Sequence, residues 1–210
     1  ASTSSVYGAN TEMPFKETDG VDHPVSLYAV TKRDNELMAH TYSYLFKIPT
    51  SGLRFFTVYG PWGRPDMSFF LFTKSILEGR PIDIYNHGDM ERDFTYVDDI
   101  VSGILNVAGT KPSEVGEAHK MTPDQSPVAP FQVYNVGNNK RVKLMDYIEA
   151  LEKVIGIEAQ KNFLPLQKGD VLKTYACVDK LEKYAGYRPS TSVEVGLKHF
   201  VDWYRDYYKM

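Results

Sequence analysis

Cysteine is almost absent from this sequence, since Cys177 is the only one among 210 residues. A single thiol cannot form a disulfide within the chain, and this composition is typical of a protein from a reducing cytoplasm. Long apolar runs are also missing, because none approaches the roughly 20 residues that a membrane-spanning helix needs. We therefore expect a cytoplasmic protein without a membrane partner.

An excess of one charge is lacking too, because 24 Lys and Arg residues stand against 27 Asp and Glu residues, which gives a net charge of −3. This balance provides no broad basic surface for nucleic acid, so an anionic ligand would have to be bound by a few local cations. The five histidines are scattered, and no pair has the spacing of metal ligands. We expect neither a nucleic-acid partner nor a metal site.

The 15 glycines include no two that are separated by a single residue. The Gly-x-Gly-x-x-Gly loop, which holds the pyrophosphate of a dinucleotide in Rossmann folds, is therefore impossible in this chain. The chain thus has no sequence signature for the phosphate end of such a cofactor.

Helical and strand-like segments alternate along the chain. Apolar spacing, with Ser, Gly and Pro at the ends, predicts helices at 26–47, 67–79, 98–109, 143–156, 180–186 and 192–208. Apolar runs predict short strands at 50–60, 82–86, 92–97 and 131–137. Residues 110–130 have no periodicity and are predicted to form a surface loop. The alternation predicts an α/β fold with a mainly parallel sheet.

Tyr28 and Lys32 stand four residues apart in the predicted helix 26–47, so they share one of its faces. An ammonium group beside a phenol stabilises the phenolate, and such a phenol can serve as a general base near neutral pH. A chain with 15 tyrosines contains about one such pair by chance, so a half-buried helix face explains the pair when it is taken alone.

Four segments around this pair favour the catalytic interpretation. They are TSSVYG (3–8), YAVTK (28–32), LRFFTVYGP (53–61) and RDFTYVDDI (92–100). Together they resemble the extended branch of the short-chain dehydrogenase/reductase superfamily, which contains nucleotide-sugar epimerases and dehydratases. Within that branch, residues 22–67 and 85–100 look like the UDP-glucuronate 4-epimerases, often labelled capsular polysaccharide biosynthesis proteins.

The resemblance implies a Rossmann-like, doubly wound parallel sheet with a smaller C-terminal α/β substrate domain, NAD as cofactor and a UDP-sugar as substrate. Thr3 takes the place of the Ser or Thr that assists the catalytic tyrosine. Tyr28 would be the base, and Lys32 would be its partner and a ligand of the nicotinamide ribose. The strand, glycine-rich loop and helix with which the family begins are not in this sequence. We therefore expect the chain to be the C-terminal portion of a longer enzyme and to be inactive on its own.

The resemblance also implies a division into domains. Residues 1–60 would be the last part of the dinucleotide-binding domain, and 61–210 would mostly form the sugar-nucleotide domain. The segments 82–110 and 131–137 would return to the sheet. Helix 26–47 would belong to the four-helix dimer interface common in this superfamily, so we expect a homodimer.

Ser4 and Ser5 stand where dehydratases and decarboxylases of this branch carry acidic residues. A hydroxyl can donate a hydrogen bond to a substrate carboxylate, which an Asp or Glu would repel. The two serines therefore favour a hexuronate substrate, with the alternative that they only fill a tight strand end. Thr57 stands where many relatives carry Asn, and it would leave space and a donor beside the C5 substituent of the sugar.

Two arginines are candidates for binding the anionic groups of a UDP-sugar. Arg64 follows a predicted strand end, where ligands of open α/β sheets gather, unless it only pairs with Asp66. Arg92 looks like the pyrophosphate arginine of the family, and its guanidinium fork suits that task. Its alternative is an ion pair with Asp93 or Asp98.

Asp170, in the segment QKGDV, matches a family Gly-Asp near the UDP ribose, whereas Gln167 stands where relatives often carry an arginine.

The whole pattern predicts NAD-dependent epimerisation at C4 of a UDP-hexuronate, from UDP-glucuronate to UDP-galacturonate through a 4-keto sugar, for surface polysaccharide precursors. The alternatives are a UDP-hexose 4-epimerase, a UDP-glucuronate decarboxylase, and a module without cofactor that only binds a sugar nucleotide.

Overall fold

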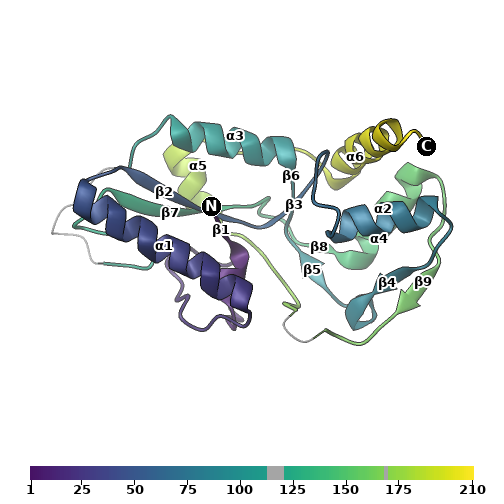
Figure 1. The fold of residues 1–210 in the computed structure, drawn as a ribbon, viewed down its shortest axis with the longest axis horizontal. Coiled ribbons are helices and arrows are strands. Elements are labelled where there is room, and N and C mark those ends of the chain that lie inside the picture. The colour runs from purple at the N-terminus through teal and green to yellow at the C-terminus, as the bar shows by residue number, and fades with distance from the viewer. Residues whose placement is uncertain (113–120, 168–169) are drawn as a thin grey trace.

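The computed structural model describes residues 1–112, 121–167 and 170–210. Figure 1 shows two halves side by side. One half contains a parallel sheet flanked by helices, and the other contains helices packed on short paired strands.

The first half is built on a three-stranded parallel sheet in the order β1-β2-β7. Its strands are β1 (Ser2–Thr3), β2 (Thr50–Phe55) and β7 (Phe131–Val136). Helices α1 (Leu27–Phe46), α3 (Val97–Ala108) and α5 (Asp179–Ala185) flank it (Figure 1). Phe131 and Val133 pack with Ala39 of α1, whereas Tyr134 and Val136 share a buried cluster with side chains of α3 and α5. Helices therefore cover both faces of the sheet, which confirms the predicted α/β fold.

Helix α1 begins after Ser26, whose hydroxyl accepts a hydrogen bond from the Ala29 N–H at 3.2 Å. It ends at Phe46, and Lys47 follows with a left-handed φ of 53°. These bounds agree with the predicted helix to within one residue. Much of the surface of α1 is apolar. Its exposed large apolar side chains include Leu27, Val30, Leu37, Met38, Tyr42, Tyr44, Leu45 and Phe46.

The second half consists of three helices and strands that pair two by two. The helices are α2 (Ser68–Leu77), α4 (Leu144–Ile155) and α6 (Val193–Tyr208). The paired strands are β3 (Thr57–Tyr59) with β6 (Phe94–Tyr96), β4 (Ile82–Ile84) with β9 (Lys161–Phe163), and β5 (Glu91–Arg92) with β8 (Val142–Lys143). Aromatic rings fill the core: Phe94 stacks on Tyr147 at a centroid distance of 4.0 Å, and Tyr59 meets both rings edge-on.

The predicted strand 50–60 is divided at Phe56. Strand β2 pairs in the three-stranded sheet as far as Phe55, whereas β3 begins at Thr57 and pairs with β6. The chain thus passes from one half to the other at Phe56, which a continuous apolar run does not reveal.

Other segments differ from the sequence pattern in smaller ways. Residues 131–136 lie in the three-stranded sheet as β7, whereas 82–84 pair with β9 outside it. The sequence does not predict β8 and β9, because strands of two or three residues depend on partners far away in the chain. Within the predicted loop 110–130, residues 113–120 lie outside the described part, and the rest has no helix or named strand.

Candidate active site

The carboxyl ends of β1 and β2 meet the start of α1 at the border between the two halves. They enclose an open cleft of about 580 Å³, which is lined by residues 1–5, the first turns of α1 and much of 55–64. Ligands of parallel α/β sheets bind beyond the carboxyl ends of the strands. The cleft therefore lies where the chemistry of such a fold takes place.

Helix α1 presents Tyr28 and Lys32 to this cleft. Tyr28 is 48% exposed, so a ligand can reach its phenol. The Nζ of Lys32 donates a long hydrogen bond of 3.4 Å to the backbone carbonyl of Ala1. Since an ammonium group has three N–H donors, Lys32 can also bind ligand hydroxyls. The pair is thus an accessible phenol next to an accessible cation, as proton transfer at a sugar hydroxyl requires.

Thr3, Ser4 and Ser5 line the same cleft. The Oγ1 of Thr3 accepts a hydrogen bond from the Ser5 N–H and donates one to the Ser5 Oγ, both at 3.3 Å. Thr3 thereby caps the short 3-10 helix η1 (Ser4–Tyr7). The sequence offered a local structural role as the alternative for Ser4 and Ser5, and Ser5 has such a role through its hydrogen bonds with Thr3. Because these bonds are long, the hydroxyls can exchange them for bonds to a ligand.

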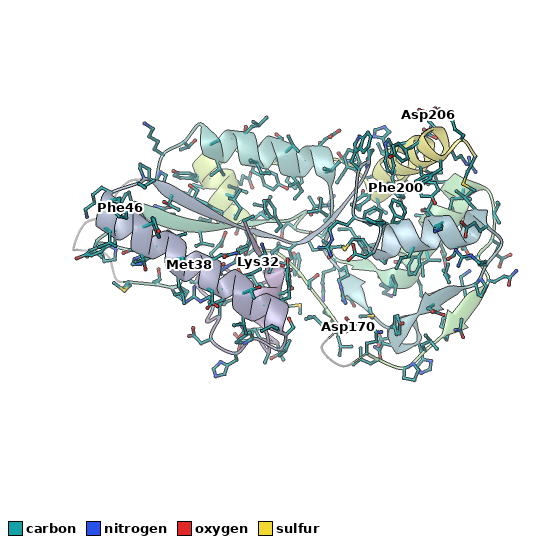
Figure 2. All side chains as sticks on the ribbon, in the orientation of Figure 1. Lys32, Met38, Phe46, Asp170, Phe200 and Asp206 are labelled. Carbon is teal, nitrogen blue, oxygen red and sulfur yellow. The ribbon has the colours of Figure 1, made fainter. Side chains whose placement is uncertain are left out.

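A second cavity of about 220 Å³ adjoins the cleft, because Thr57 and Met67 line both. It also contains Arg92 and Asp170. In Figure 2, Lys32 lies on the end of α1 nearest the second half, and Asp170 lies at the near edge of that half. The predicted site residues thus line two adjacent cavities.

Arg92 is the cation of the second cavity. Its Nη1 donates to the backbone carbonyls of Glu91 at 3.0 Å and Leu172 at 2.9 Å. Burial lowers the pKa of the Arg92 guanidinium, and the charge of Asp170 opposes that shift. An anion bound beside Arg92 would be stabilised by a positive charge that is held in place on one side.

The alternative for Arg92, an ion pair with Asp93 or Asp98, is wrong in the described structure. Asp93 is fully buried and accepts hydrogen bonds from the backbone N–H groups of Asn138 at 2.6 Å and Ala176 at 3.1 Å. Neither carboxylate is within ion-pair distance of Arg92 among the described contacts. The guanidinium therefore keeps donors for a ligand.

Arg64 lines the first cleft but is engaged by Asp66. Its Nε and Nη2 donate to the two oxygens of that carboxylate at 3.1 and 2.5 Å. Both side chains are exposed, so this pair contributes little to stability and a stronger anion can replace Asp66.

Asp170 lines the second cavity, and its backbone N–H donates to the carbonyl of Gln167 at 3.2 Å. The glycine that precedes Asp170 lies outside the described residues. The family pattern of Gly-Asp is therefore placed here only through its aspartate.

Asp83 and Tyr85 are among the lining residues that the sequence did not single out. They face the second cavity, whereas Ile82 and Ile84 between and beside them are buried in the core. A strand places alternate side chains on opposite faces. The alternation in this segment was the signal that could have found both residues.

Among the described residues, no group of three or more His, Cys, Asp or Glu side chains could hold a metal ion. Within the same residues, no helix is both long enough and apolar enough to cross a membrane.

The family model of the NAD dependent epimerase/dehydratase family matches residues 1–137. The chain belongs to this family. Protein CapI of Staphylococcus aureus is 57% identical over 210 residues, which are 100% of this chain and 63% of CapI. UDP-glucuronate 4-epimerase 2 of Arabidopsis thaliana is 46% identical, over 100% of this chain and 48% of its own.

Solved structures show the same relationship. The UDP-glucuronic acid 4-epimerase of Bacillus cereus, in complex with UDP-glucuronic acid and NAD, is 35% identical and superposes with a TM-score of 0.84. The match covers 99% of this chain and 60% of that one. The UDP-glucose 4-epimerase of Thermotoga maritima, with UDP-glucose, is 26% identical with a TM-score of 0.84 and 62% of its chain covered. The chain thus spans less than two thirds of each of these relatives.

Proposed function

We propose that the protein is an NAD-dependent epimerase that inverts C4 of UDP-glucuronate to give UDP-galacturonate, a precursor of surface polysaccharide. The observation that carries the proposal is the position of Tyr28, Lys32 and Thr3 around one cleft, which shares the lining residues Thr57 and Met67 with the cavity of Arg92 and Asp170. The first space suits proton transfer at a sugar, and the second suits a nucleotide diphosphate.

The cleft fits one end of NAD. Lys32 presents an ammonium with available donors, which suits the hydroxyls of the nicotinamide ribose, beside the accessible phenol of Tyr28. NAD would supply the acceptor and donor of hydride at C4. The chain contains no Gly-x-Gly sequence for the pyrophosphate, so its own residues are suited to the nicotinamide end alone.

Tyr28 would remove the proton from the 4-hydroxyl of the sugar and return it after the sugar has turned over, with Thr3 as hydrogen-bond partner. The 4-keto uronate formed in between is a β-keto acid, which loses CO₂ readily. Ser4, Ser5 and Thr57 would hold its carboxylate so that the C5–C6 bond stays out of line with the carbonyl π system. All three residues line the cleft.

The rest of the UDP-sugar would lie in the second cavity. Arg92 would bind the pyrophosphate and Asp170 the ribose, and Arg64 would contact a phosphate or the carboxylate after releasing Asp66. Arg92 supports this assignment because its described hydrogen bonds go only to backbone carbonyls, and the neighbouring charge of Asp170 helps to keep the guanidinium charged.

We also propose a cytoplasmic homodimer that forms through α1. The support is the row of exposed apolar side chains on this helix, since contiguous apolar surface is typical of interaction sites. We further propose that residues 1–60 belong to the dinucleotide-binding domain and 61–210 mostly to the sugar-nucleotide domain. Of the two segments expected to return to the sheet, 131–136 lies in it as β7, whereas the strands of 82–110 pair outside it, so that part of the expectation is wrong.

Product analysis tests the activity. The intact protein is incubated with UDP-glucuronate and NAD⁺, and the nucleotide sugars are separated. We expect UDP-galacturonate in equilibrium with the substrate. A UDP-pentose with release of CO₂ would identify a decarboxylase instead, and turnover of UDP-glucose alone would identify a hexose epimerase.

A further inference from the structure

A buried carboxylate, on Glu36, links three elements that line the cleft, α1, β1 and β2, by hydrogen bonds. Glu36 of α1 is only 3% exposed, and Arg54 of β2 is 0% exposed. The Nε and Nη2 of Arg54 donate to the two oxygens of Glu36, both at 2.9 Å. The hydroxyl of Ser2 in β1 donates to Glu36 Oε1 at 2.6 Å. The Nη1 of Arg33 donates a fourth hydrogen bond to the carboxylate, to Glu36 Oε2 at 3.0 Å.

The partners of Glu36 lie next to the residues of the cleft. Ser2 immediately precedes Thr3, and it pairs with Arg54 in the parallel register of β1 and β2. Glu36 lies one helical turn after Lys32 and two turns after Tyr28 on the same side of α1. A shift of Glu36 against Ser2 would therefore move Tyr28 relative to Thr3.

The contact between Glu36 and Arg54 is a buried ion pair, and its charges affect how precisely α1 and β2 are positioned. Burial of Glu36 disfavours its charge, but the hydrogen bond and the charge of Arg54, the hydrogen bond from Ser2 and the charge of Arg33 together outweigh this and hold the pKa of Glu36 below its usual value. A buried ion pair often contributes no more stability than apolar side chains of the same size. It does, however, fix one relative position of its elements, because hydrogen bonds are directional, whereas apolar surfaces can slide.

We propose that Glu36 is a positioning residue, which fixes α1 along β1 through Ser2 and Arg54 and so sets the distance between Tyr28 and Thr3. Lys32 makes a second, longer contact just before the same strand, a hydrogen bond from its Nζ to the carbonyl of Ala1 at 3.4 Å. The inference rests on the proposed function, since it assigns Glu36 a task in that reaction.

Ser2→Ala in the intact protein is the decisive variant, because it removes one hydrogen bond and leaves the Glu36–Arg54 pair intact. We expect kcat to fall about ten- to a hundredfold, as displacements of about 1 Å do. The Kd of UDP should not change, because Arg92 and Asp170 lie in the other cavity. Ser2→Thr, which keeps the hydroxyl, should restore most of the loss.

Asp124→Asn serves as the matched control. Asp124 is 3% exposed and accepts from Lys180 Nζ at 2.6 Å, and it lines neither cavity. The variant should lower the melting temperature as much as Ser2→Ala or more, with kcat unchanged. If Ser2→Ala also lowers only the melting temperature, Glu36 is a stability residue and the proposal is overturned.

Amide hydrogen exchange separates this proposal from the proposed function. Ser2→Ala should accelerate exchange in residues 28–36 of α1 more than in α6, whether or not the protein turns over UDP-glucuronate. A wild-type protein without turnover would refute the epimerase assignment only. Unchanged exchange in 28–36 would refute the positioning role even in an active enzyme.

Discussion

At the residue scale, Tyr28 is the group on which the proposed chemistry depends. We expect Tyr28→Phe in the intact protein to lower kcat by about 10²–10⁴-fold, because a positioned general base typically contributes that much. UDP affinity and stability should change little, since the ring remains. Steady-state kinetics and UDP titration measure both quantities. Tyr42→Phe, at another exposed tyrosine of α1, is the control. A Tyr28→Phe enzyme with more than about a tenth of the wild-type kcat would show that another group is the base.

Arg92 is the second residue whose role can be measured directly. Removal of a charge-assisted contact to the pyrophosphate should cost about 1.5–3 kcal/mol, so Arg92→Ala should raise the Kd of UDP about ten- to a hundredfold. Arg92→Lys should recover only part of this loss, because a point charge cannot reproduce the guanidinium fork. Calorimetric titration with UDP and thermal unfolding are performed on the same sample. A lower melting temperature with unchanged UDP affinity would mean that Arg92 acts only on the carbonyls of Glu91 and Leu172.

The sequence predicted where these residues lie better than it predicted their partners. The resemblance to the family singled out Tyr28 and Lys32, their spacing places them on one face of a helix, and both line the cleft. The carbonyl partners of Arg92 are backbone atoms whose position depends on the tertiary fold, so no side-chain pattern could reveal them. Glu36 and Arg54 were equally hidden, because charged residues in a helix and a strand are ordinarily solvated.

At the element scale, Asp93 stands just before β6 and joins it by hydrogen bonds to two other segments of the chain. These segments contain Asn138, just after β7, and Ala176. The Asp93 carboxylate accepts from the Asn138 and Ala176 N–H groups and from the Thr95 hydroxyl. Burial raises the pKa of Asp93 to about 6, although these hydrogen bonds oppose the shift. The folded state thus holds the proton more tightly than the unfolded chain, whose aspartates titrate near 3.9.

This shift predicts a pH dependence of stability. The contribution of Asp93 is fully present below about pH 4 and is lost as the pH rises through about 6, which amounts to about 3 kcal/mol. Because the amide introduced by Asp93→Asn cannot ionise, the advantage of the wild type over this variant should shrink by about that amount between pH 4 and pH 7. Denaturant unfolding at several pH values measures it. Asn138→Ala loosens the same junction without a titratable change, so its difference from wild type should stay constant.

The extent of each element was predictable where local signals define it. Ser26 begins α1 and Gly156, with φ 81°, follows the end of α4, so both helices are visible in the sequence. The division of one apolar run at Phe56 was not predictable, because it depends on which strands are available for pairing. The same reason hides β8 and β9.

At the scale of the whole molecule, the exposed apolar surface of α1 predicts self-association. We expect Leu37→Glu to convert a dimer of the intact protein into monomers at micromolar concentration, since a charge in an apolar contact is strongly unfavourable. Sedimentation velocity measures the change. Leu105→Glu on α3, where the leucine is 66% exposed, is the matched control and should leave the dimer intact. Equal effects of the two variants would place the interface elsewhere.

The absence of a Gly-x-Gly sequence gives a second prediction at this scale. A polypeptide of these 210 residues should show no measurable affinity for NAD⁺ and no epimerase activity, because nothing in it is suited to the pyrophosphate. Isothermal titration calorimetry with NAD⁺ measures this directly, and titration with UDP on the same sample shows whether the second cavity is formed. Micromolar NAD⁺ binding would contradict the prediction.

Thr57 and Met67 stand in the wall common to both cavities, next to the point where the chain changes sheets. Under the proposed function, a substrate must reach Tyr28 in one cavity and Arg92 in the other. Free glucuronate and glucuronate 1-phosphate present the same C4 and the same carboxylate, but neither carries the pyrophosphate that Arg92 would bind. We therefore expect the intact protein to turn over UDP-glucuronate far more efficiently than these smaller uronates.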